Sequence, residues 1–289
     1  MVQNRLYIAQ NIDATQLDRA FKIFCPIHAM VYHPFCDDFG PLNLSSIIKF
    51  IKLLDMELAA FPENKIVFLV KNGRRNLMNA VFLLGSYMVL KHGISPNTAA
   101  ACFSNLDAKT LEFYRDATYA DPDFNLCLLD CWKSLEKGMK HRWIQLSRST
   151  AFWGMINIKQ YRHFEDPANG DLQEVVPGKF IAFKGPVDIG SQKYRDSEDG
   201  IRLFSPSYYA DIFRDMGVST IIRLNEPRYD ARDFTSRGFE HFDLFFEDCT
   251  SPPDAVVAEF HRIVSAGGAP SPSTATPGWA APARSSRCI

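Results

Sequence analysis

The feature that most constrains the fold of this chain is a repeated order of short apolar run, turn and amphipathic segment. In the first half, an apolar run over Lys65–Val70 precedes a turn over Lys71–Asn76 and a helical pattern over Leu77–His92 that Gly93 ends. Another helical pattern covers Leu42–Leu58. Apolar runs of about four to eight residues are typical of buried strands, and apolar spacings of three and four residues are typical of helices.

Two further helices are predicted at 97–114 and 125–142. The same order returns in the second half of the chain, with helices predicted at 207–216, 229–237 and 254–264, and strands at 218–224 and 241–246. Strands that alternate with helices favour a parallel or mixed central sheet with helices on its faces, so the predicted class is α/β. A polar, Gly-containing stretch over 189–204 is the predicted linker between two domains.

The composition excludes several classes of protein. Lys and Arg number 32 against 33 Asp and Glu, so the formal net charge is -1, unlike that of a general nucleic-acid binder. The apolar runs are far shorter than the ~18 residues of a membrane-spanning helix, and Met1–Leu6 has no apolar signal core. Seven scattered cysteines indicate thiols in a reducing compartment. We expect an intracellular protein without nucleic-acid or membrane partners.

One group of residues has the spacing of metal ligands. Cys25, His28, His33 and Cys36 form two Cys/His pairs, and thiolate with imidazole suits zinc. They lie in an apolar run over Phe21–Phe35 that is typical of strands, where cysteine is a common core residue. The core interpretation is favoured, and no metal or other cofactor is predicted.

The turn over Lys71–Asn76 joins a predicted strand to a predicted helix. Backbone N–H groups at a helix N-terminus form a cradle for anions, and Arg74 with Arg75 add positive charge. The turn contains no cysteine, serine or threonine, so nothing in it can attack a bound anion. A solvated turn is the alternative.

Five segments carry a resemblance to a known family: Asp38–Leu44, Asn169–Asp171, Val176–Phe180, Ile222–Asn225 and Gly238–Phe246. Over residues 3 to 264 the chain resembles the mitotic-exit, cell-division-cycle-fourteen family of dual specificity protein phosphatases. The resemblance implies tandem cysteine-phosphatase-like domains. We expect a non-catalytic substrate-groove domain over 1–188, the linker over 189–204, an incomplete catalytic domain over 205–264, and a low-complexity, disordered tail over 265–289.

The resemblance also implies a chemistry. Family members hydrolyse phosphoserine or phosphothreonine followed by proline, and phosphotyrosine, with a Cys nucleophile, a phosphate-binding Arg and an Asp acid. Asp248 matches that acid, at the end of a predicted strand. Glu165 and Asp171 match the acidic segment that binds a basic substrate residue. Arg162 replaces an acid there, which weakens this preference, and Cys249 replaces a glycine beside the acid.

The signature of a cysteine phosphatase, His-Cys, five residues, then Arg, is missing after the helix over 254–264. Cys288, the one cysteine downstream, precedes only Ile289, so we expect no nucleophile and no activity. Read in a shifted frame, the codons of the tail can encode residues like those of the family's strand, phosphate cradle and helix. The codon for the Cys would then span the codons of Thr274 and Ala275, and the codon for the Arg would span those of Ala280 and Ala281. Chance similarity of a disordered tail is the alternative.

Three hypotheses about function stay open at this stage. The first is an inactive relative of enzymes that act on Ser-Pro phosphoproteins, and the second is a module that binds phosphopeptides or a partner without hydrolysis. The third is a zinc-stabilised interaction domain. The family resemblance implies a nuclear, cytoplasmic or cytoskeleton-associated protein, while the oligomeric state, the substrate and the origin of the frame change are not predicted.

Overall fold

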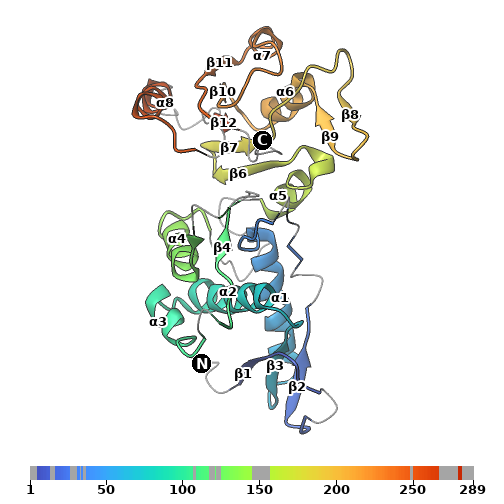
Figure 1. Ribbon diagram of the computed structural model, residues 1–289, viewed down its shortest axis with the longest axis vertical. Coiled ribbons are helices and arrows are strands. Elements are labelled where there is room, and N and C mark those ends of the chain that lie inside the picture. The colour runs from blue at the N-terminus through green and yellow to red at the C-terminus, as the bar shows by residue number, and fades with distance from the viewer. Residues whose placement is uncertain are drawn as a thin grey trace. The chain divides into compact units, whose positions relative to one another are not determined.

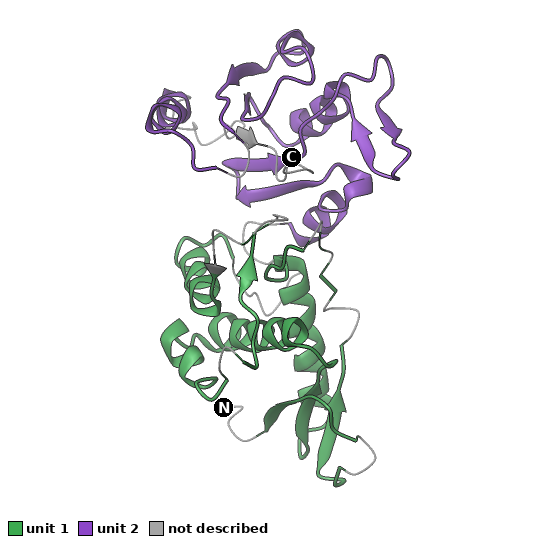
Figure 2. Cartoon of the chain, viewed as in Figure 1, with its two compact units in different colours: residues 1–146 green, residues 147–289 purple. Residues whose placement is uncertain are grey.

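A computed structural model describes residues 5–13, 17–26, 31–32, 34, 37–106, 109–116, 121, 125–144, 157–247, 250–266 and 279–281. The chain divides into two compact units, residues 1–146 and 147–289 (Figure 2). Both units combine strands with flanking helices, as the sequence predicts (Figure 1).

Unit 1 is built on a three-stranded parallel sheet in the order β1-β3-β2. Its elements are β1 (Leu6–Ala9), β2 (Phe21–Phe24), α1 (Leu44–Ala60), β3 (Lys65–Leu69), α2 (Arg74–His92), α3 (Pro96–Ala101), β4 (Tyr114–Arg115), β5 (Asn125–Leu126) and α4 (Leu128–Lys140). Asn43 caps α1, because its side-chain oxygen accepts a hydrogen bond from Ser46 N at 2.9 Å. Gly93 ends α2 in the left-handed conformation, at φ 65°.

The core of unit 1 requires a glycine inside α2. A Cβ atom at Gly85 would lie 2.1 Å from Cζ2 of Trp132, which is buried on α4. The indole Nε1 of Trp132 donates to the backbone oxygen of Phe82 at 3.1 Å. Gly85 therefore lets the two helices pack closely, although glycine lowers helix propensity.

Unit 2 contains a mixed set of strands. Its elements are α5 (Ile158–Phe164), a short 3-10 helix (Pro167–Asn169), β6 (Leu172–Val176), β7 (Phe180–Phe183), β8 (Tyr194–Asp196), β9 (Arg202–Phe204), α6 (Pro206–Asp215), β10 (Thr220–Arg223), α7 (Arg232–Thr235), β11 (Glu240–Asp243), α8 (Asp254–Ala266) and β12 (Trp279–Ala281). Strands β6 and β7 are antiparallel, β12 is parallel to β7, and β10 is parallel to β11. Strands β8 and β9 form an antiparallel pair.

The division between the units lies upstream of the predicted linker over 189–204. The β6–β7 hairpin belongs to unit 2 because its buried residues Leu172, Ile181 and Phe183 share one apolar cluster with α6. Phe183 contacts the rings of Tyr209 and Phe213 at centroid distances of 4.9 and 4.8 Å. The predicted linker itself contains β8 and β9.

Several predicted elements differ from those observed. Among the described residues of the predicted helix at 97–114, those up to Ala101 are helical, in α3, and Tyr114 lies on a strand. The predicted helix at 125–142 begins with β5 and becomes helical only in α4, and that at 229–237 shortens to α7. The tail, for which no element was expected, contributes the end of α8 and all of β12. None of the described helices has the length and apolarity that a bilayer crossing requires.

Candidate functional site

The turn after β3 joins strand to helix as predicted, but α2 begins at Arg74, three residues earlier than expected. Gly73 adopts φ +122°, a conformation that favours glycine. Gln10 Nε2 donates to the backbone oxygens of Lys71 at 2.6 Å and Gly73 at 3.1 Å. Asn76 Nδ2 donates to Asn72 O at 2.8 Å. Side-chain hydrogen bonds therefore fix the backbone of this turn.

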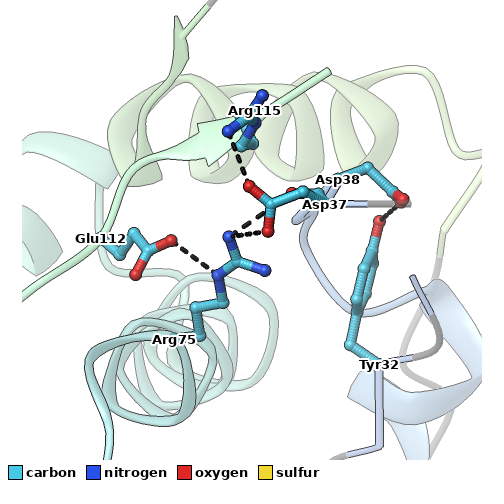
Figure 3. Close-up of polar contacts among 6 residues, drawn as sticks. All are labelled: Tyr32, Asp37, Asp38, Arg75, Glu112 and Arg115. Atoms are coloured by element: carbon cyan, nitrogen blue, oxygen red, sulfur yellow. Dashed lines mark hydrogen bonds and ion pairs between the residues drawn. The ribbon is translucent and has the colours of Figure 1, made fainter. Parts of the chain in front are cut away.

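Arg75, at the end of the turn, faces internal acceptors (Figure 3). Arg75 Nε lies 2.6 Å from Glu112 Oε1, and Arg75 Nη2 lies 2.9 Å from Asp37 Oδ1. Arg115 Nη1 contacts the other oxygen of Asp37 at 2.8 Å. Burial alone would lower the pKa of Arg75, but the hydrogen bonds and charges of Glu112 and Asp37 raise it above its ordinary value.

These contacts bear on the predicted anion cradle. The positive charge of Arg75 is balanced inside unit 1 by two carboxylates, and Arg74 Nη2 donates to Leu111 O at 2.7 Å. An external phosphate would have to compete with Asp37 and Glu112 for the same guanidinium. The arrangement is that of a structural ion-pair network, not of an open anion site.

The segment before α1 is pinned to the same region. Phe39 exchanges backbone hydrogen bonds with Arg115, at 3.3 and 2.8 Å, and its buried ring lies 5.0 Å from that of Tyr114. Tyr32 donates its hydroxyl to Asp38 Oδ2 at 2.6 Å (Figure 3). The Asp38–Leu44 segment therefore has a packing role in unit 1.

In unit 2, an ion pair joins β10 to β11. Arg223, buried with 7% exposure, donates Nε to Asp243 Oδ1 at 2.7 Å and Nη2 to Asp243 Oδ2 at 3.0 Å. Its Nη1 donates to Tyr229 O at 2.7 Å. The ring of His241 is buried beside this pair and shares a 2.8 Å hydrogen bond with the Tyr229 hydroxyl. Burial lowers the pKa of His241 below its ordinary value.

The predicted substrate-binding residues lie at the two ends of one loop. Glu165 ends α5, and Asp171 precedes β6 with φ 47°; both are half-buried. Helix α6 holds the loop, because Tyr208 and Tyr209 donate their hydroxyls to the backbone oxygens of Asn169 at 2.9 Å and Gly170 at 2.7 Å. These two acidic residues therefore flank a segment that α6 fixes, and their substrate-binding role stays a prediction.

Comparisons with known proteins find similar sequences among the dual specificity phosphatases. Residues 1–138 match the family described as "Dual specificity protein phosphatase, N-terminal half". The chain is 37% identical over 234 residues to the dual specificity protein phosphatase CDC14C of Symphalangus syndactylus, covering 80% of this chain and 46% of the relative. It is 34% identical over 265 residues to CDC14A of Mus musculus, covering 91% of this chain and 42% of that protein.

The chain belongs to the CDC14-like family of dual specificity phosphatases. This CDC14-like chain spans less than half the length of these two relatives. The solved structure titled "Protein Tyrosine Phosphatase (putative) from Leishmania major" aligns with 36% of this chain and 58% of its own chain, at 23% identity and a TM-score of 0.26.

The predicted acid of the CDC14-like chain, Asp248, lies outside the described residues, as does Cys249. Strand β11 ends at Asp243, and residues 244–247 lead toward it. The assignment of Asp248 stays a prediction. Sequence reasoning missed the pair of Arg223 with Asp243, which lies five residues before Asp248. Opposite charges on neighbouring strands meet only in one register, here Arg223 opposite Asp243.

The predicted zinc cluster is largely outside the described residues: His28, His33 and Cys36 are among those not placed. Cys25 follows β2 and is exposed, so the expectation that it is a core residue is wrong. The strand ends at Phe24, whose side chain supplies the buried position. Within the described ranges, no three His, Cys, Asp or Glu side chains are grouped so as to hold a metal ion.

Proposed function

We propose that this chain derives from a gene for a CDC14-like phosphatase that hydrolyses phosphoproteins, phosphoserine before proline preferred, and that the polypeptide as written does not hydrolyse them. One observation carries the second part. Each cysteine from Cys25 to Cys249 lacks an arginine six positions later, and residues 267–287, after α8, contain no cysteine. The phosphoprotein substrates follow from the family.

The chemistry explains why this loss matters. A cysteine thiolate attacks phosphorus, the bond from phosphorus to the leaving oxygen breaks, and an Asp protonates that oxygen. The thiolate needs backbone N–H groups and a cation to stay ionised. Asp248 would supply the proton, and afterwards take one from the water that releases phosphate. Without a sulfur nucleophile, this acid has no reaction to assist.

The coding pattern of the tail supports a frame change as the cause. Tryptophan has a single codon, so the codon spanning Trp279 and Ala280 encodes glycine in the shifted frame. The shifted Cys at Thr274/Ala275 and Arg at Ala280/Ala281 are six codons apart, the spacing of the signature. Sequencing the transcript across the codons for Val264 to Trp279 tests this. A stop codon inside the shifted signature, with no shift in the transcript, contradicts it.

A binding module is the second candidate, because the described parts of unit 1 and the 165–171 loop are folded without the signature. Titration of the full chain with a labelled phosphoserine-proline peptide distinguishes the two. We expect no measurable affinity, since a cradle normally supplies most phosphate contacts. Saturable binding that the unphosphorylated peptide does not reproduce would favour the module. A nuclear, cytoplasmic or cytoskeletal location is proposed from the family alone.

A further inference from the structure

A lysine lies buried at the end of β7 in unit 2. Lys184 directly follows Phe183, the last residue of β7, and is 6% exposed. Its Nζ donates to the backbone oxygen of Arg202 at 3.0 Å. A buried ammonium is costly unless an opposite charge or several hydrogen bonds compensate for the loss of water. The surroundings of Lys184 should therefore contain a counter-charge.

The strand register places that charge. In the β6–β7 pair, Leu172 stands opposite Phe183, so the preceding Asp171 and the following Lys184 are the next residues to meet. Lys184 N donates to Asp171 O at 3.0 Å, which continues the pairing by one step. This backbone hydrogen bond keeps Lys184 and Asp171 adjacent across the hairpin, where their opposite charges attract.

The charge of Asp171 acts on two buried groups. Burial lowers the pKa of Lys184, and the charge of Asp171 opposes that shift. Burial raises the pKa of Tyr209 well above its ordinary value, and the charge of Asp171 raises it further. Both groups therefore experience the Asp171 carboxylate, which is itself only half-buried.

We propose that Lys184 is the internal counter-ion of Asp171 and thereby a specificity-determining residue. The inference rests on the proposed function, in which Asp171 belongs to the substrate-binding segment. With its charge balanced from inside, Asp171 attracts a basic substrate residue weakly, and exposed Arg162 on α5 adds repulsion. The substrate class is then Ser-Pro phosphopeptides in which a following lysine confers little advantage, with Glu165 providing what preference remains.

The pairing is tested in the chain as it exists, without any activity. Thermal unfolding is measured for Lys184→Met, Asp171→Asn and the double variant, with exposed Lys179→Met as the matched control. We expect each single change to lower the Tm of unit 2, the double variant to lose less than the sum of the two, and the control to unfold normally. Additive losses would overturn the pairing. If Lys184→Met alone is insoluble, a soluble double variant supports the pair and an insoluble one contradicts it.

The specificity is tested in the frame-restored protein. The kcat/KM is measured for two phosphoserine-proline peptides, one with a following lysine and one with alanine in its place. The ratio of the two values is then compared between the Lys184→Met and Lys179→Met variants. One freed surface charge is worth about fivefold, so we expect the ratio to rise by about that factor for Lys184→Met only. An unchanged ratio overturns the specificity role. Absence of aryl phosphate turnover in the same preparation contradicts the proposed function instead, and the unfolding experiment still decides the pairing.

Discussion

The guanidinium of Arg223 and the carboxylate of Asp243 meet at two points across β10 and β11, at 2.7 and 3.0 Å. Arg223 is 7% exposed, whereas the Asp243 side chain is 54% exposed. Water at Asp243 screens the pair, so its removal should cost less than the ~3–5 kcal/mol of breaking a fully buried one. The pair ties the strand before Asp248 to its neighbour.

Replacing Arg223 by methionine is expected to destabilise unit 2 by about 2 kcal/mol. The change removes both contacts to Asp243 and the hydrogen bond to Tyr229 O. Urea unfolding followed by circular dichroism measures the loss. Arg232, whose exposed guanidinium pairs with Asp230, provides the control, and Arg232→Met should unfold like the unmodified chain. Equal losses in the two variants would contradict a special role for Arg223.

Replacing Gly85 by alanine is expected to destabilise unit 1 by about 3 kcal/mol, near the upper end for overpacked cores. The new Cβ would overlap the Trp132 ring, and neither α2 nor α4 can move away without opening the core. Gly138→Ala is the control, since its nearest neighbour is the flexible end of Ile144 at 3.1 Å. Thermal unfolding compares the two, and a stable Gly85→Ala protein would show that the predicted overlap is absent.

The stability of unit 2 is expected to decrease as the pH is lowered below neutrality. His241 has a lowered pKa in the folded state, because burial outweighs the nearby charge of Asp243. The unfolded chain binds the proton near pH 6.5, so stability is full above that value and is lost as the pH falls toward the folded pKa. Tm measured between about pH 7.5 and 5.5 should drop less in His241→Gln. The control variant His261→Gln changes an exposed histidine on α8, so its Tm should fall with decreasing pH as much as that of the unmodified chain.

Unit 1 should not gain stability from phosphate. Asp37 and Glu112 already occupy Arg75, so phosphate and chloride at equal ionic strength should give the same Tm. Asp37→Asn removes the charge shared by Arg75 and Arg115 and, the carboxylate being largely exposed, should cost less than about 1 kcal/mol. A phosphate-dependent rise in the Tm of the unmodified chain would show that the network admits external anions.

Local pattern predicted those elements that have regular apolar spacing. The helix α1 and the strand β3 follow from such spacing, although the strands that pair with β3 lie far from it in the sequence. The spacing around Tyr114 predicts a helix, yet Tyr114 pairs with Leu126 of β5 and packs its ring on Phe39, far earlier in the chain. Tertiary contacts of this kind override local propensity.

The candidate site was predictable to the extent that it depends on residue type. The family resemblance predicts Glu165 and Asp171 as substrate-binding residues, and the structure places them at the two ends of the segment between α5 and β6. The role of Lys184 was not predictable, because nothing in the sequence states that Phe183 stands opposite Leu172. Register, which decides which charges meet, is a property of the folded sheet.

The most direct test of the account is hydrolysis of an aryl phosphate by the chain as written and by its frame-restored counterpart, prepared side by side. The account predicts no turnover by the first and turnover by the second, which Asp248→Asn should lower by about 10²–10⁴-fold when the leaving group is a serine peptide. Turnover by the chain as written, or an inert frame-restored protein that is folded, would contradict it.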